Sequence, residues 1–224
     1  TMIWFIDGVE VGSLAHTGQV SDRGNGYIGW SGWSSEYFDG AIDEVKIFDN
    51  ALSNSQINDL YAAGQSPLPN SAGHWPLDEQ NGTTAGDVSG QGYDGTLVNG
   101  ITFDNDSGNG QIGDALIFDG SDDRIDLPDI DDDLQAGFSV SAWINPENTS
   151  GYQAIAGTHT SAGFMTFVHN GKLAFALDTD VSRKIASHGT IVANQWQHIT
   201  VTYDGTTMIW FIDGVEVGSL AHTG

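Results

Sequence analysis

The same eighteen residues, TMIWFIDGVEVGSLAHTG, occur at 1–18 and again at 207–224 without a single change. The offset between the two copies is 207 minus 1, or 206 residues. Identity at a fixed offset is typical of a tandem array, although duplication of one segment alone would leave the same pattern. On either origin we expect the chain ends to fall inside a folding unit. A fold with one place for this segment cannot accommodate both copies in the same way.

Each copy of the repeated segment reads as a β-hairpin. Residues with high β-propensity flank Asp7-Gly8, and this dipeptide is a strong signal for a two-residue hairpin turn. Asn170-Gly171 and Asp204-Gly205 occur in the same setting. Short strand-like runs with turn residues at their ends recur along most of the chain, so the sequence predicts an all-β fold built as an antiparallel sandwich or barrel.

One segment has the pattern of a helix. In ALSNSQINDLYAAG at 51–64, Ser53 is followed three residues later by Gln56, which is the spacing of a capping box. Leu52, Ile57 and Leu60 supply an apolar stripe. The sequence therefore predicts one short helix of about 54–62, packed over an edge of the sandwich.

The composition restricts the partners of the protein. Thirty acidic residues face six basic ones, giving a net charge of -24. Phosphate contacts need basic side chains, so nucleic acid is excluded as a partner, and anionic membrane surfaces are excluded for the same reason, whereas cations are attracted. No apolar run approaches the length of a membrane span, so no membrane insertion is expected. Cysteine is absent, which removes disulfides and thiolate chemistry.

A break in the strand pattern divides the chain. The segment QSPLPNSA at 65–72 contains two prolines and no strand pattern, so it is predicted to be a linker. Residues 1–64 would then be the C-terminal part of one repeat, and 73–224 the N-terminal part of the next. In repeat order the motifs are HWPLDEQNGTTAGDVSGQGYDGTL, GDALIFDGSDDRIDLP, FSVSAWINP, NQWQHITVTYDGTTMIWFIDGVEVG and YFDGAIDEVKIFDNALSNSQINDLY.

In that order the chain resembles a bacterial laminin-G-like domain of the concanavalin A-like lectin and glucanase superfamily. The resemblance implies a jelly roll of two antiparallel sheets whose natural ends lie close together. Two arrangements of the chain are then open. Residues 1–64 could complete a sandwich with an adjacent identical repeat or subunit, head to tail in a fibre, or they could close onto their own chain as a permuted module. We expect the first arrangement, with few core contacts between 1–64 and 73–224.

The resemblance also implies a calcium site. Related domains that bind calcium use an aspartate on the last long strand together with the N-terminal segment and an FDG turn. The matching positions here are Asp43, Gly120 and either Asp78 or Glu79. Carboxylate and carbonyl oxygens are the ligands that Ca²⁺ prefers. The alternative is that these residues are solvated acids and turn formers in a very acidic chain.

A segment rich in aromatic, glycine and serine residues suggests a carbohydrate site. In YIGWSGWSSEYFDG at 27–40, Trp30, Trp33 and Tyr37 stand where a core strand would carry aliphatic residues, and Tyr152 and His169 are further candidates. The alternative is that these side chains close over the core or contact the next repeat. The remaining tryptophans are expected in the core: Trp75, Trp143, Trp196 and Trp210.

The sequence argues against catalysis. Glucan hydrolases of the superfamily carry the spacing Glu-x-Asp-x-x-Glu, and this chain has none. Asp43 and Glu44 are neighbours on a predicted strand, so their side chains should point to opposite faces. The sequence therefore predicts a non-catalytic structural or adhesive module of an extracellular or cell-surface tandem-repeat protein, stabilised by calcium. A carbohydrate-binding module that uses the Trp-rich segment is the alternative.

Overall fold

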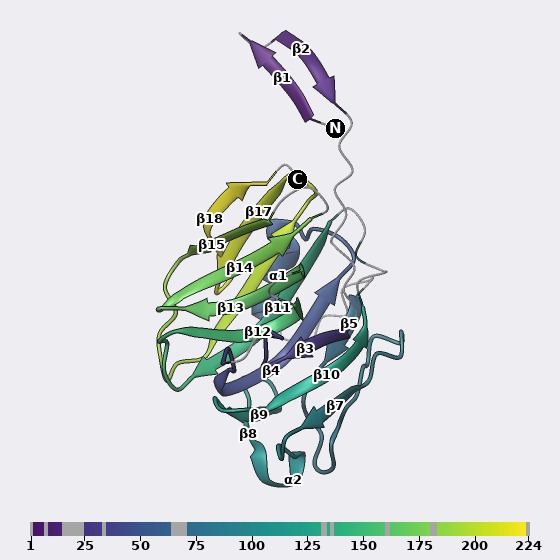
Figure 1. Ribbon diagram of the computed structural model, residues 1–224, viewed down its shortest axis with the longest axis vertical. Coiled ribbons are helices and arrows are strands. Elements are labelled where there is room, and N and C mark those ends of the chain that lie inside the picture. The colour runs from purple at the N-terminus through teal and green to yellow at the C-terminus, as the bar shows by residue number, and fades with distance from the viewer. Residues whose placement is uncertain are drawn as a thin grey trace.

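The computed structural model describes residues 2–6, 9–14, 25–32, 35–63, 71–130, 134, 137–159, 162–179 and 183–222, with only the backbone described for 2–14. Within these ranges the chain forms two eight-stranded antiparallel sheets that pack as a jelly-roll sandwich, and a separate two-stranded sheet (Figure 1). The predicted all-β sandwich is confirmed.

The strands of the first sheet, in spatial order, are β15 (Arg183–His188), β14 (Lys172–Asp178), β13 (Ala162–His169), β12 (Tyr152–His159), β3 (Asn25–Ile28), β10 (Arg124–Asp129), β7 (Gly95–Val98) and β6 (Thr84–Ala85). Those of the second sheet are β18 (Val215–Ala221), β17 (Thr207–Ile212), β16 (Gln197–Tyr203), β11 (Phe138–Pro146), β4 (Asp39–Phe48), β9 (Asp114–Asp119) and β8 (Ser107–Asn109), with β5 (Ser71–Trp75) paired to β4.

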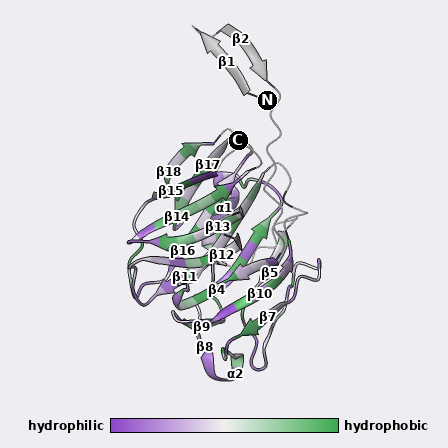
Figure 2. Cartoon of the chain, in the orientation of Figure 1, coloured by the Kyte–Doolittle hydropathy of each residue, from purple (hydrophilic) through white to green (hydrophobic). Residues whose placement is uncertain are grey.

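The core lies between the two sheets. On β11, alternate residues Val140, Ala142 and Ile144 are fully buried there, as the two-residue period of a strand requires. Hydrophobic residues follow strands such as β4 and β14, whereas most connecting segments are hydrophilic (Figure 2). Burying each large apolar side chain contributes roughly 1.5–3 kcal/mol, so this core dominates the stability of the sandwich.

Strand β4 closes the sandwich within one chain. One edge of β4 pairs with β11, and the other pairs with β9 and β5. Its inward side chains, among them Ile42 and Ile47, belong to the main core. The expectation of few core contacts between 1–64 and 73–224 is therefore wrong for residues 25–63. These residues complete the sandwich of their own chain, so no neighbouring repeat is required to bury them.

Strand β5 begins earlier than the predicted linker allows. Ser71 pairs with Phe48, so the last two residues of the predicted linker belong to a strand. Trp75, further along β5, is fully buried and donates from Nε1 to the carbonyl of Tyr93 at 2.8 Å. Residues 65–70 lie outside the described residues.

The two copies of the repeated segment form the same hairpin in different settings. In β1 (Met2–Ile6) and β2 (Val9–Leu14), Met2 pairs with Leu14; in β17 and β18, Met208 pairs with Leu220. Both hairpins shift register immediately after the equivalent tryptophan. Strand β17 pairs along β16, whereas β1 and β2 form the separate two-stranded sheet. The place beside β16 is thus taken by the second copy.

The predicted helix is α1 (Asn54–Ala63), and its capping box is confirmed. The Ser53 backbone N–H donates to Gln56 Oε1 at 3.0 Å, and the Gln56 N–H donates to Ser53 Oγ at 3.4 Å. Ile57 and Leu60 pack with Phe48 of β4 and Phe211 of β17, so α1 covers an outer face of the second sheet and not the predicted edge. A second helix, α2 (Phe103–Asp106), has four residues and was not predicted. Neither helix in the described part of the chain is long and apolar enough to cross a membrane.

Strand β4 is irregular at Glu44. Glu44 has φ of +54°, and the pairing with β11 shifts register at this point. Ile42 and Val45 are three residues apart, yet both lie in the core. The prediction that Asp43 and Glu44 point to opposite faces assumed a regular strand, and this bulge removes that assumption.

Candidate metal centre and binding pocket

Asp43, in the middle of β4, is a fully buried carboxylate. Its Oδ2 accepts the backbone N–H of Ile112 at 2.9 Å, whereas its Oδ1 is buried without a hydrogen-bond partner. Burial raises the pKa of Asp43 to about 7, against the lowering effect of the Ile112 N–H, and the charges of Glu44 and Asp78 raise it further. The site therefore disfavours the ionised carboxylate unless a cation compensates it.

The loop before β9 joins Asp43 to Asp78. The Asp114 N–H donates to Asp78 Oδ1 at 2.7 Å, so one loop is held by both carboxylates. Glycines permit this close approach. A Cβ at Gly110 would lie 2.7 Å from Asp43 Oδ2, and one at Gly113 would lie 2.3 Å from Asp78 Oδ1 on a backbone with φ of +66°. The loop thus depends on glycine at both positions.

Glu79 supplies a second unsatisfied oxygen. Its Oε1 accepts the N–H of Gly86 at 2.7 Å, and its Oε2 is buried without a partner. Among the described residues, Asp43 and Glu79 are the two that hold a buried carboxylate oxygen with no hydrogen-bond partner, and the sequence predicted both as calcium ligands. Buried polar atoms are nearly always satisfied in folded proteins, so each of these two oxygens is an exception that a bound cation could account for. Carboxylate oxygens suit Ca²⁺. In the described part of the chain, however, Asp119, Asp122 and Asp123 are the one group of three acidic or histidine side chains whose ligand atoms lie within 4.8 Å of one another, so Asp43, Asp78 and Glu79 are not drawn together into such a group.

Glu44 is not part of this centre. Its Oε2 accepts hydrogen bonds from Lys46 Nζ and, at 2.9 Å, interacts with His74 Nε2. Burial acts to raise the pKa of Glu44, but His74 and Lys46 hold it below its usual value. The buried Glu44 carboxylate is therefore paired with basic side chains, unlike the carboxylate of its neighbour Asp43.

The structure places Gly120 away from Asp43. A Cβ at Gly120 would lie 2.7 Å from the Cβ of Asp39, four residues before Asp43 on β4. Gly120 follows β9, whereas the loop that reaches Asp43 precedes β9. The structure therefore does not bring Gly120 together with Asp43, although both were predicted to share one ion. The Gly-x-x-Gly-Asp spacing at 110–114 is the sequence signal for the loop that contacts Asp43.

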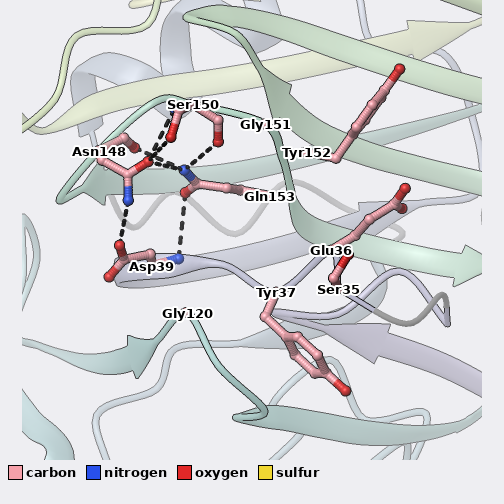
Figure 3. A pocket seen from close by; sticks show the side chains of 10 residues that line it. All are labelled: Ser35, Glu36, Tyr37, Asp39, Gly120, Asn148, Ser150, Gly151, Tyr152 and Gln153. Carbon is pink, nitrogen blue, oxygen red and sulfur yellow. Dashed lines mark hydrogen bonds between the residues drawn. The ribbon is translucent and has the colours of Figure 1, made fainter.

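Tyr37 and Tyr152 both line a second site. They line a cavity of about 380 Å³ together with Glu36, Asp39 and Gly120, so residues from distant parts of the chain converge there. Figure 3 shows Tyr152, Glu36 and Tyr37 on one side and the Asn148–Gln153–Asp39 hydrogen bonds on the other. The volume lies within the range of roughly 300–1,000 Å³ typical of small-ligand pockets. We call this cavity the tyrosine pocket.

Both tyrosines have aromatic support. The Tyr37 ring stacks on Trp30 with centroids 5.9 Å apart, and Trp30 in turn lies 4.8 Å from the Arg124 guanidinium carbon. The Tyr152 ring stacks on His169 at 3.9 Å. Trp30 and His169, both predicted as ligand-binding residues, therefore stand behind the tyrosines and not among the residues that line the pocket. Such support reduces the ordering cost of binding. Trp33 lies outside the described residues.

Side-chain amides form the polar wall of the tyrosine pocket. Gln153 Nε2 donates to Asn148 Oδ1 at 2.9 Å, and Asn148 Nδ2 donates to Asp39 Oδ2. The Asp39 N–H donates to Gln153 Oε1 at 3.4 Å, which closes the network. Sequence reasoning missed these three residues because no local pattern joins them: they come from β4, from β12 and from the loop before β12.

The comparisons with known proteins decide the family. A family model described as concanavalin A-like lectin/glucanases superfamily, Laminin G 3, matches residues 1–58 and 119–224. The chain belongs to this superfamily. Comparison with curated proteins gives no match. Within the superfamily match lie Asp43 and both tyrosines of the pocket, whereas Asp78, Glu79 and the loop before β9 fall between the matched segments. The laminin-G-like resemblance deduced from the five sequence motifs is thus confirmed.

Proposed function

We propose that this laminin-G-like chain is a non-catalytic, lectin-like adhesion module that acts outside the cell, is stabilised by calcium and binds carbohydrate in the tyrosine pocket. The superfamily supports a lectin-like or adhesive role. The observation that carries the carbohydrate assignment is that two tyrosines, Tyr37 and Tyr152, line one cavity together with carboxylate and amide side chains.

The chemistry of the tyrosine pocket suits a sugar. A pyranose ring presents an apolar C–H face and a rim of hydroxyl groups. Aromatic rings pack against the first, and a few placed polar groups orient the second. Tyr152 is 42 % exposed, which leaves its ring available to a ligand, while Glu36 and Asn148 supply an acceptor and an amide nearby.

Glycan binding is tested by an array of immobilised glycans followed by calorimetric titration of the sugars that bind. We expect Tyr152→Ala to weaken binding about tenfold or more, as for an aromatic contact at the centre of a site. Tyr61→Ala is the matched control, because Tyr61 is 39 % exposed and lies on α1. If no glycan binds the wild-type protein while calcium still stabilises it, the chain is a purely structural module.

The calcium assignment rests on the unsatisfied oxygens of Asp43 and Glu79. A ligand that binds only the native state at 100 times its Kd stabilises that state by about 2.7 kcal/mol. For a chain of this length that corresponds to a rise in Tm of about 5–10 °C. This rise is the difference in Tm between thermal unfolding in CaCl₂ and in EDTA, and NaCl of equal ionic strength in place of CaCl₂ is the control. An unchanged Tm would contradict the assignment.

A further inference from the structure

A second cavity lies beside the tyrosine pocket on the outer face of the second sheet. It has a volume of about 210 Å³, and Trp196, Asn145 and Glu147 are among the residues that line it. We call it the Trp196 pocket. Trp196 was expected in the core, but it is only half-buried and forms part of this wall.

Strand register explains why this cavity is hollow. Ala41 pairs with Asn145 on one side and with Ile117 on the other, so the three residues form one row across the sheet. Their neighbours Ile42 and Ile144 point into the core, so this row faces outward. The small side chain of Ala41 leaves a depression in the row between larger ones.

The Trp196 pocket has the same chemistry as the tyrosine pocket. Trp196 offers an aromatic surface, Glu147 an exposed carboxylate, and Asn194 an amide whose Nδ2 donates to the Glu147 carbonyl at 3.2 Å. The Oδ1 of Asn145 is buried without a hydrogen-bond partner. An unsatisfied acceptor in a cavity wall indicates a place for a donor such as a sugar hydroxyl.

The two cavities adjoin each other along the same strands. Asp39 lines the tyrosine pocket and Ala41 lines the Trp196 pocket, two residues further along β4 and about 7 Å away at the rise of a strand. On the segment that faces β4, Glu147 lines the Trp196 pocket and its neighbour Asn148 lines the tyrosine pocket. The Glu147 N–H donates to the Asp39 carbonyl at 2.8 Å, and this bond forms the low ridge between the cavities.

The charges of the two cavities restrict the ligand. Glu36, Asp39 and Glu147 line them, and the described residues that line either cavity include no lysine or arginine. Three carboxylates without a basic partner repel uronate, sulfate and sialate groups and tolerate neutral or amino-bearing sugars.

We infer that the tyrosine and Trp196 pockets are two subsites of one extended binding surface, whose ligand is a neutral or amino-bearing oligosaccharide long enough to bridge both. The inference rests on the proposed carbohydrate function and specifies its ligand class. Because the ligand is continuous across the ridge, its second part binds at the high effective concentration set by the first.

The test is calorimetric titration of the full chain with three series of one to six units: N-acetylglucosamine, glucosamine and galacturonate oligomers. Affinity for the neutral or amino series should rise about tenfold or more between the shortest and the longest members, and the uronate series should bind at least about tenfold more weakly. Trp196→Ala should abolish the rise with length, so that this variant binds its longest and shortest oligomers with similar affinity. Trp196→Phe should retain part of the rise. Val192→Ala, at an exposed position close in sequence, is the control for folding.

The outcomes separate the two claims. If Trp196→Ala binds every length as the wild type does, or if affinity does not depend on length, the extended surface is overturned while the tyrosine pocket stands. Equal binding of the uronate series overturns the charge selectivity. If no oligomer binds the wild type, or if Tyr152→Ala binds every oligomer as the wild type does, the proposed carbohydrate function itself fails.

Discussion

The two ends of β9 carry two groups of carboxylates that differ in their hydrogen bonding. At the start of β9, the loop at 110–114 meets Asp43 and Asp78. At its end, one oxygen from each of Asp119, Asp122 and Asp123 lies within 4.8 Å of the others. Burial raises the pKa of Asp123 to about 6, as it raises that of Asp43 to about 7. By charge alone the two groups look alike.

The difference lies in what each oxygen accepts. Asp119 Oδ1 accepts the backbone N–H groups of Ser121 and Asp122, and Asp123 Oδ2 accepts the N–H of Asp119. Burial acts to raise the pKa of Asp119, but these backbone donors hold it below its usual value. The group at the end of β9 thus uses its carboxylates to form a turn. Asp43 Oδ1, by contrast, is buried away from solvent and accepts no hydrogen bond from the protein. In a chain with a net charge of -24, acidity alone does not distinguish the two groups, whereas the unsatisfied buried oxygen of Asp43 does.

The largest expected difference concerns pH. The pKa of Asp43 is about 7 in the folded protein and about 3.9 in an unfolded chain. Between these values the unfolded state releases its proton first, so the calcium-free protein should lose about 1.4 kcal/mol of stability per pH unit as pH rises, or about 4 kcal/mol in all. Urea unfolding of the wild type and of Asp43→Asn from pH 4 to pH 8 measures this as a growing difference between them. For Asp123→Asn the corresponding difference should stop growing near pH 6.

The next prediction concerns the sign of one substitution. At pH 8 without calcium, Asp43→Asn removes a desolvated charge but buries an amide N–H, so we expect a net gain of about 2 kcal/mol in the free energy of unfolding. The same variant should gain nothing further from calcium. A loss of stability in EDTA would show that Asp43 already has a compensating partner in the protein.

Glycine substitutions test the loop that joins the two carboxylates. Gly113 and Gly82 both have positive φ, but a Cβ at Gly113 would strike Asp78, whereas one at Gly82 meets nothing within 4 Å. Gly82→Ala should cost about 1 kcal/mol of backbone strain. Gly113→Ala should cost at least about 1 kcal/mol more and also weaken calcium binding. If Gly113→Ala costs the same free energy of unfolding in EDTA as in calcium, the loop does not contribute to calcium binding.

The smallest expected effect is at the end of β9. The double variant Asp119→Asn/Asp122→Asn keeps side-chain acceptors for the turn and removes two exposed charges, so it should change stability by no more than about 0.5 kcal/mol. Its response to calcium should equal that of the wild type. Loss of that response would place the ion at this turn and not at Asp43.

Particular residues show how far sequence reasoning reached. The capping box at Ser53, the hairpins at Asp-Gly turns and the calcium candidates Asp43, Asp78 and Glu79 follow from local patterns or from the family resemblance. The loop at 110–114, the outward position of Trp196 and the bulge at Glu44 do not, because each depends on strand register and on neighbours distant in the sequence. The repeated hairpin gives the clearest case. Identical residues form the same strand pairing and the same register shift twice, but only the second copy joins the sandwich, since β16 offers one edge to fill.

The central claim is that a calcium ion binds at Asp43, and calcium titration calorimetry of three proteins tests it most directly. The wild type should bind one ion, Asp43→Asn should bind none, and Asp119→Asn/Asp122→Asn should bind one with unchanged affinity. Retention of the ion by Asp43→Asn together with its loss from the double variant would contradict the account.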